Sequence, residues 1–176
     1  VVAVSAGWYH SIAITADGAV CSWGFGYDGQ LGHGDQQRQL LPKKIEAFTG
    51  WRVVAVSAGE DHSIAITADG AVCSWGFGYD GQLGHGDQQR QLLDIATASP
   101  SPPTAASGAG AGEPLASWAT RRRAVHQSLP KEIVAFAGRR VVAVSAGYNH
   151  SLAATADGAI WSWGYGGERQ LGHGDT

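Results

Sequence analysis

The feature that most constrains the fold is a segment that occurs three times. Residues 53–93 repeat residues 1–41 and differ from them only at two adjacent positions. A looser third copy occupies residues 141–175. The first two copies begin 52 residues apart, at Val1 and Val53. Recurrence at a period of about 50 residues indicates an array of structural repeats, so the pattern within one copy should predict one structural unit.

Each copy has the pattern of four short β-strands. In the first copy, strand-like runs at 1–6 and 10–15 flank Gly7-Trp8-Tyr9, and the Asp17-Gly18 pair that follows is a strong hairpin signal. A third strand is expected at 19–23, a glycine-rich loop at 24–35, and a fourth, outer strand at 42–48, where a proline and charges suit a sheet edge. The sequence therefore predicts an all-β fold, a partial β-propeller of about three blades, each a four-stranded antiparallel sheet.

The predicted units follow the copies and one interruption. They are repeat 1 at 1–52, repeat 2 at 53–93 together with 129–140, an insertion at 94–128, and an incomplete repeat 3 at 141–176. The insertion is rich in Ala, Ser, Pro and Gly, which predicts disorder, with one weak helix at 115–127. Non-coding sequence retained in a gene model would have the same composition, and the sequence leaves both interpretations open.

Composition narrows the functional classes. Hydrophobic residues make up 44% and charged residues 15% of the chain, which is typical of a globular protein. The net charge of −3 argues against direct contact with nucleic acid, and no apolar run is long enough for a membrane span. We expect an intracellular protein, in the cytoplasm or the nucleus, because no signal peptide is evident and Cys21 and Cys73, at equivalent positions, should be reduced. The chain has no methionine, so we expect it to be a fragment of a longer protein.

Two signatures recur in all three copies. Ala-Gly-x-x-His-Ser occupies 6–11, 58–63 and 146–151, and Ser-Trp-Gly is followed by Gln-Leu-Gly-His-Gly. Together they resemble the repeats of the regulator of chromosome condensation family. This resemblance implies a seven-bladed propeller with one blade per repeat, so we expect further repeats or self-association to complete it. The positions expected to serve structure are Gly7, His10, Trp23, Gly59, His62, Trp75, Gly147, His150 and Trp163.

Glycine-rich motifs in the loops do not predict a cofactor. Residues 24–29 and 76–81 match G-x-G-x-x-G, but no helical pattern follows them, and Arg169 replaces the last glycine in the third copy. A dinucleotide site needs that helix. The same loop resembles a calcium-binding nonapeptide, which requires tandem copies rather than one per unit. We expect no cofactor.

Histidine and serine also recur without forming a predicted catalytic or metal site. Repeat-equivalent histidines should be distributed one per blade, so we expect no metal and expect each ring to bind the backbone of a neighbouring loop. Ser11 follows His10, and adjacent residues of a strand point to opposite faces, which excludes a triad within one blade. We expect no catalytic residue and no enzyme activity. The run at 121–123, three arginines, is interpreted as a solvated linker, with an import signal as the alternative.

The two near-identical copies diverge only at the turn between the first and second strands. Large aromatic side chains at such a turn favour an interface over solubility, although neutral drift at a tolerant turn remains the alternative. The predicted partner-binding residues are Trp8, Tyr9, Glu60, Asp61, Tyr148 and Asn149.

The functional hypothesis is a non-enzymatic protein–protein interaction module that presents these turns on one rim. The family resemblance implies a first alternative, a guanine-nucleotide exchange factor for a Ran-type small GTPase, which makes such a GTPase a candidate partner. A second alternative is a UV-B photoreceptor-like propeller, because residues 7–11 approach the Gly-Trp-Arg-His-Thr motif of a plant branch of the family.

Overall fold

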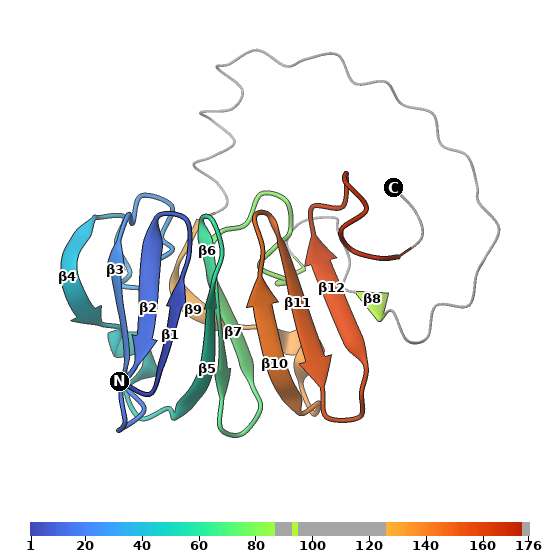
Figure 1. The fold of residues 1–176 in the computed structure, drawn as a ribbon, viewed down its shortest axis with the longest axis horizontal. Coiled ribbons are helices and arrows are strands. Elements are labelled where there is room, and N and C mark those ends of the chain that lie inside the picture. Colours follow the sequence, from blue (N-terminus) through green and yellow to red (C-terminus); the bar gives the residue numbers. More distant parts are fainter. Residues whose placement is uncertain (87–92, 95–125, 174–176) are drawn as a thin grey trace, which may run out of the picture.

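The computed structural model describes residues 1–86, 93–94 and 126–173, and these form three four-stranded antiparallel sheets (Figure 1). The first sheet contains β1 (Ala3–Ala6), β2 (His10–Ile14), β3 (Val20–Gly24) and β4 (Gln39–Lys44), in that order. The second contains β5 (Val53–Ala58), β6 (His62–Thr67), β7 (Val72–Phe77) and β9 (His126–Glu132). The third contains β10 (Val141–Ala146), β11 (His150–Thr155), β12 (Ile160–Gly164) and β8 (Leu93–Asp94).

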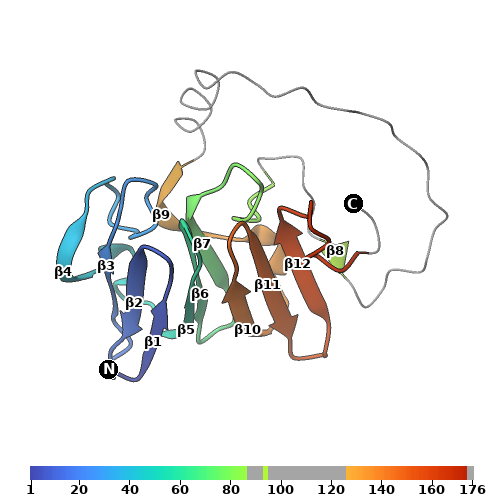
Figure 2. The same cartoon turned by 45° about the horizontal axis from the view of Figure 1, so that its top comes forward.

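The sheets stand side by side as successive blades. Figure 2 shows their first strands, β1, β5 and β10, next to one another on one side of the arc, with the fourth strands at the opposite edges. The predicted fold class, a partial β-propeller of about three blades, is confirmed.

The chain on either side of the insertion contributes to two different blades. β9 pairs with β7 and completes the second blade, and it begins at His126, inside the segment assigned to the insertion from sequence. Asp94, also within that segment, pairs with Trp161 of β12 in the third blade. The rest of the predicted insertion, with most of its predicted weak helix, lies outside the described residues.

The fourth strand differs from its sequence prediction of 42–48. β4 ends at Lys44, and residues Glu46–Phe48 form a short 3-10 helix, η1. The reason is the burial of Ile45 and Phe48, which are 0% and 4% exposed. Alternate residues of a strand share a face, so a continued strand would point these two side chains to opposite sides. One 3-10 turn aligns positions three apart and lets both enter the core. In the second blade, η2 (Val134–Phe136) likewise lets Ile133 and Phe136 both enter the core.

The hydrophobic core consists of two layers, each filling the space between two blades. In the first layer, Ile12, Ile14 and Phe48 of blade 1 pack against Val53 and Trp75 of blade 2. The second layer repeats this arrangement between blades 2 and 3 and contains Trp161 and Trp163. Burial between blades is therefore the main source of stability, and each blade depends on its neighbour.

Cys21 and Cys73 are not bonded to each other, and burial raises the pKa of the Cys73 thiol to about 12. Within the described residues, no helix has the length and apolarity needed to cross a membrane.

Candidate protein-interaction rim

A repeated polar joint links neighbouring blades. The carbonyl oxygen of Gln30, in the loop after β3, accepts hydrogen bonds from Ser63 Oγ (2.8 Å) and from Trp75 Nε1 (2.8 Å) of the next blade. The carbonyl of Gln82 accepts the equivalent bonds from Ser151 Oγ (2.9 Å) and Trp163 Nε1 (2.7 Å). These tryptophans are fully buried, so their indole N–H groups need this acceptor. The joint fixes the register of each blade on the next.

The histidines of the first signature complete the joint. His10 Nε2 lies 2.8 Å from Ser63 Oγ, and His62 Nε2 lies 2.9 Å from Ser151 Oγ. Each serine already donates its proton to a glutamine carbonyl, so the histidine must donate from Nε2. Burial, the main cause, lowers the pKa of His10 to about 4 and that of His62 to about 3. For His62 the expectation of a loop-backbone partner is corrected, because its ring binds the Ser151 side chain of the next blade. His10 binds the Ser63 side chain and also has the expected backbone hydrogen bond, to Glu60 in the turn of the next blade.

The histidines of the second signature also contact serine, within their own blade. Ser74 Oγ donates to the carbonyl of Leu83 (2.6 Å) and lies 2.9 Å from His85 Nε2. The same pair forms between Ser22 and His33 (3.1 Å). The Gln-Leu-Gly-His-Gly loop is therefore held against the third strand of its blade.

The His–Ser pairs do not have the arrangement of a nucleophile and a base. In Ser63 the proton that a base would remove is committed to the Gln30 carbonyl, and His10 presents an N–H rather than a lone pair. Within the described residues, no three His, Cys, Asp or Glu side chains are close enough to hold a metal ion.

Glycine lets the turns between first and second strands approach one another. A Cβ added to Gly7 would lie 2.3 Å from the carbonyl oxygen of Gly59, and one added to Gly59 would lie 2.5 Å from that of Gly147. Trp8 N donates to the same Gly59 carbonyl at 3.2 Å. Side chains at these positions would push the turns apart, so the glycines bring the three turns together at one end of the sheets.

Five aromatic side chains form a continuous stripe along this end. Ring centroids are 5.2 Å apart between Tyr148 and Trp8, 6.2 Å between Trp8 and Tyr9, 5.8 Å between Tyr9 and Phe25, and 4.7 Å between Phe25 and Tyr27. We call Tyr148, Trp8, Tyr9, Phe25 and Tyr27 the aromatic stripe. Trp8 is 66% exposed, and Tyr9, Tyr27 and Tyr148 are each more than half exposed. The stripe joins the first and third blades, because Tyr148 belongs to the third and the other four rings belong to the first.

The other three predicted partner-binding residues serve mainly as supports. Glu60 is only 8% exposed and accepts a hydrogen bond from the phenol of Tyr148, which raises the pKa of that tyrosine. Asp61 Oδ1 accepts from Gln30 Nε2 at 3.3 Å, and Asn149 Oδ1 accepts from Gln82 Nε2 at 3.4 Å. The structure thus brings all six residues to one rim but divides them into exposed rings and polar supports.

The sequence analysis did not predict Phe25 and Tyr27 as partner-binding residues, because it considered their glycine-rich motif only as a possible dinucleotide or calcium site. The available signal was the pair of aromatic residues between the glycines, at the same end of the blade as Trp8 and Tyr9.

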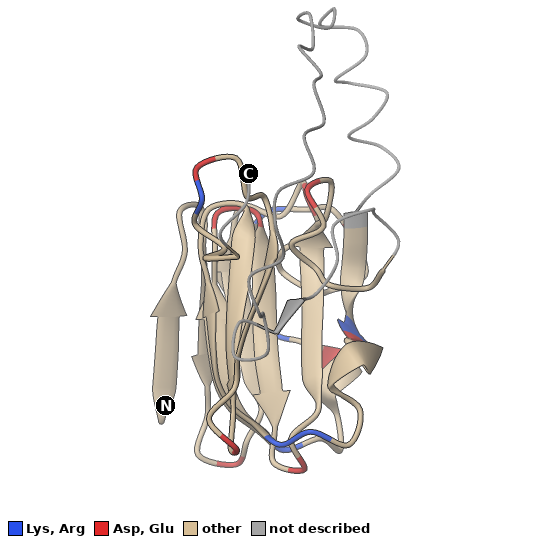
Figure 3. Cartoon of the chain, turned by 90° about the vertical axis from the view of Figure 1, so that its right-hand side faces the viewer, with Lys and Arg blue, Asp and Glu red and all other residues tan. Residues whose placement is uncertain are grey.

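The two ends of the sheets differ in charge. Figure 3 shows basic and acidic residues at the lower end, where the second and third strands are joined, and mainly acidic residues at the upper end. Charged residues of the upper-end turns and loops, within the described part of the chain, are Asp28, Asp35, Glu60, Asp61, Asp80 and Glu168, with Arg38 and Arg169.

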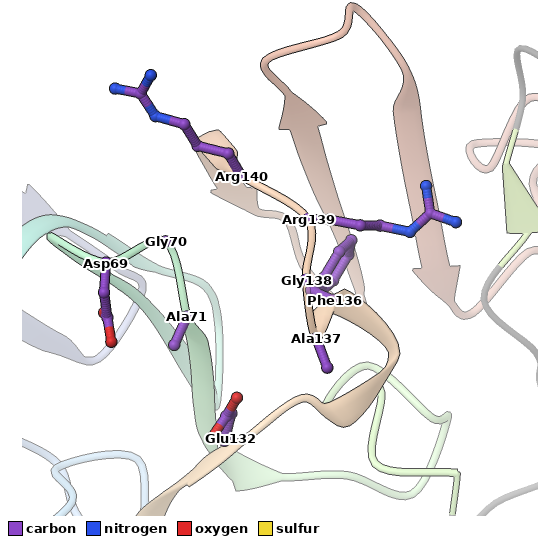
Figure 4. Close-up of a pocket in the computed structure, with 9 residues that line it drawn as sticks. All are labelled: Asp69, Gly70, Ala71, Glu132, Phe136, Ala137, Gly138, Arg139 and Arg140. Carbon is purple, nitrogen blue, oxygen red and sulfur yellow. The ribbon is translucent and has the colours of Figure 1, made fainter.

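A hollow of about 410 Å³ lies at the lower end, between the second and third blades (Figure 4). Asp69 and Glu132 line one side, and Phe136, Arg139 and Arg140 line the other. The guanidinium of Arg139 lies over the ring of Trp161, 4.6 Å from its centroid. Figure 4 shows the two arginine side chains pointing apart, so the hollow does not present convergent groups to one ligand.

These features define a β-propeller built from repeats whose signature residues form the joints between blades. The Regulator of chromosome condensation (RCC1) repeat model matches residues 17–66 and 69–109, and a second model of that repeat matches 1–30, 53–82 and 141–170. The chain belongs to the regulator of chromosome condensation repeat family.

Similar proteins have different functions. The chain is 38% identical to the Ultraviolet-B receptor UVR8 of Arabidopsis thaliana, over 99% of its own length and 44% of that protein. It is 36% identical to the E3 ubiquitin-protein ligase HERC2 of Homo sapiens, over 98% of its length and 4% of that protein. The crystal structure of Prp20p from Saccharomyces cerevisiae matches with a TM-score of 0.66 at 22% identity, over 99% of this chain and 34% of that one. The chain thus spans less than half the length of these proteins.

Proposed function

We propose that this chain is a protein–protein interaction module whose contact surface is the rim that carries the aromatic stripe. The observation that carries the proposal is the stripe itself, in which four of five joined rings are more than half exposed. Contiguous exposed aromatic surface is typical of binding sites, and tryptophan and tyrosine are enriched among the residues that dominate binding energy.

The rigid support of the Trp8 and Tyr148 rings is a second argument for this surface. Trp8 and Tyr148 sit on turns that glycine contacts bring together, and the phenol of Tyr148 is held by Glu60. Side chains that are already ordered lose little conformational entropy when a partner binds, so more of the contact energy appears as affinity.

The two alternatives raised from sequence have weaker support. Prp20p is known for binding to Gsp1p and histones, but its likeness to this chain is one of fold. UVR8 is the more similar relative, yet tryptophan occupies this turn only in the first of the three blades, at Trp8. Nucleotide exchange on a Ran-type GTPase and UV-B reception therefore remain predictions from family membership.

Site-specific photocrosslinking tests the proposed surface. A photoreactive phenylalanine analogue is placed at Trp8 or, as a matched control, at Trp51, which precedes β5 and so lies at the opposite end of the sheets. Trp51 is also exposed (45%). We expect one discrete protein adduct from position 8 that is absent when Tyr148→Ala is added. Equal adducts from both positions, or none from position 8, would contradict the proposal.

A further inference from the structure

The charge beside the aromatic stripe is mainly negative. The rings of the stripe and their polar supports lie on turns and a loop at residues 7–9, 25–34, 59–61 and 147–149. These segments contain Asp28, Glu60 and Asp61 but neither lysine nor arginine. The one histidine there, His33, is kept neutral near pH 7 because burial lowers its pKa. These segments therefore accompany the exposed rings with three carboxylates, while the arginine nearest to them in sequence, Arg38, follows Gln37, which packs against Gly26 at the Phe25–Tyr27 end of the stripe.

Ring geometry adds to this negative field. Trp8 and Tyr148 meet edge to face, with an interplanar angle of 84°, and Trp8 remains 66% exposed. The face of an aromatic ring is electron-rich and attracts cations, most strongly in tryptophan. The Glu60 carboxylate lies at the same place, bound to Tyr148 and nearly removed from water, where its charge is less screened. The Trp8 ring and the Glu60 carboxylate therefore both favour a cationic ligand.

We infer that the aromatic stripe receives an arginine or lysine side chain from a short basic segment of a partner protein, with the cation on the Trp8 ring and beside Glu60. This inference rests on the proposed function and specifies the chemistry of the partner. The chain contains a comparable contact, because the Arg139 guanidinium lies 4.6 Å from the centroid of Trp161.

A second copy of the chain is the less suitable occupant of this surface. A symmetric dimer would bring the same surface together from both sides, so one interface would contain Asp28, Glu60 and Asp61 twice, and the described loops of this end would offer only Arg38 and Arg169 as basic partners. Like charges brought together across an interface disfavour association.

Titration of the ¹⁵N-labelled chain with an arginine peptide tests the inference. The probe is acetyl-Gly-Ser-Arg-Gly-Arg-Ser-Gly-amide, and its control has citrulline, which is neutral and of similar shape, in place of both arginines. The indole N–H resonances of Trp8 and Trp51 are assigned by Trp8→Phe and Trp51→Phe. We expect the Trp8 resonance to shift saturably while that of Trp51 stays, with at least about tenfold weaker binding of the citrulline peptide.

The role of the carboxylate is tested separately. Glu60→Gln keeps an oxygen that can accept from Tyr148 but removes the charge, so we expect the arginine peptide to bind about threefold to tenfold more weakly. Glu46→Gln, in η1 at the opposite end, should leave binding unchanged. Thermal unfolding of each variant checks that the fold is intact.

Three outcomes would overturn the inference. They are equal binding of the arginine and citrulline peptides, no movement of the Trp8 resonance, and self-association of the chain that Trp8→Phe abolishes in sedimentation equilibrium. If the arginine peptide does not bind but Tyr148→Ala still removes the crosslink from position 8, the proposed partner chemistry is wrong and the proposed interaction surface is retained. If that crosslink is also absent, the proposed function fails as well.

Discussion

Serine hydroxyls carry much of the specificity of the blade joints. Ser151 donates to the Gln82 carbonyl and accepts from the fully buried His62, so one small side chain serves two polar groups of the preceding blade. Ser63 does the same for Gln30 and His10. A buried polar group left without its partner is destabilising, so these hydroxyls should matter more than their size suggests.

We predict that Ser151→Ala lowers the free energy of unfolding by about 1–3 kcal/mol, because His62 Nε2–H then has no acceptor. The measurement is urea-induced unfolding followed by circular dichroism. Ser11 is the matched control: it has the same place in the first blade, but no described blade precedes it. Ser11→Ala should change the free energy of unfolding by less than about 0.5 kcal/mol. Equal losses in the two variants would show that the joint contributes nothing specific.

Acid should destabilise the fold through the buried histidines. The pKa of His62 is about 3 and that of His10 about 4 in the folded chain, against 6.5 for an ordinary histidine. Between these values the unfolded chain binds protons that the folded chain does not. Stability is therefore complete above about pH 6.5 and is lost as the pH falls, by up to about 1.4 kcal/mol per pH unit for each histidine.

The measurement is the free energy of unfolding between pH 7 and pH 4. His62→Gln keeps an N–H that can reach Ser151 but cannot titrate. Its free energy of unfolding should therefore decrease less steeply as the pH falls, because the contribution of one histidine is removed. An unchanged slope in His62→Gln would contradict the assignment of the acid sensitivity to this residue.

At the scale of elements, the loop after the third strand has two functions. Its Gln30 carbonyl joins the next blade, while Phe25 and Tyr27 extend the aromatic stripe. Gly32 enables the first function: its φ is +75°, and a Cβ added there would lie 2.9 Å from the indole nitrogen of Trp75. The loop can therefore lie directly on the tryptophan of the next blade.

Gly32→Ala should destabilise the chain by about 1–2 kcal/mol more than Gly50→Ala. Both glycines have positive φ, +75° and +85°, so both variants share the backbone strain. Only Gly32 meets a neighbour, because an added Cβ at Gly50 has nothing within 4 Å. Thermal and urea unfolding of the two variants give the difference. A loss in Gly50→Ala as large as that in Gly32→Ala would mean that the contact with Trp75 is unimportant.

Sequence reasoning predicted the elements better than the contacts between them. Alternating runs and Asp17-Gly18 were enough for the first three strands, because hairpin signals are local. The fourth strand was misplaced, since its end depends on the burial of Ile45 and Phe48 against the next blade. The partner of His10 lies 53 residues away, and one sequence does not reveal which side chains meet across a blade interface. The supporting role of Glu60 was missed for the same reason.

At the scale of the whole molecule, three blades held in register produce one continuous surface. Trp8 and Tyr148 are 140 residues apart in sequence and come from the first and third blades, yet their rings are in contact. Neither blade alone could form the aromatic stripe. The joints therefore serve the interaction surface as well as stability, because they fix the distance between the turns that carry it.

The most direct test of the account is the affinity of the crosslinked partner for three forms of the chain: unmodified, Trp8→Ala and Trp51→Ala. Isothermal titration calorimetry with the purified partner gives each Kd. The account predicts that Trp8→Ala weakens binding at least tenfold, which corresponds to about 1.4 kcal/mol, while Trp51→Ala changes it less than twofold. Equal effects of the two substitutions, or a larger effect of Trp51→Ala, would contradict the assignment of the binding surface to the aromatic stripe.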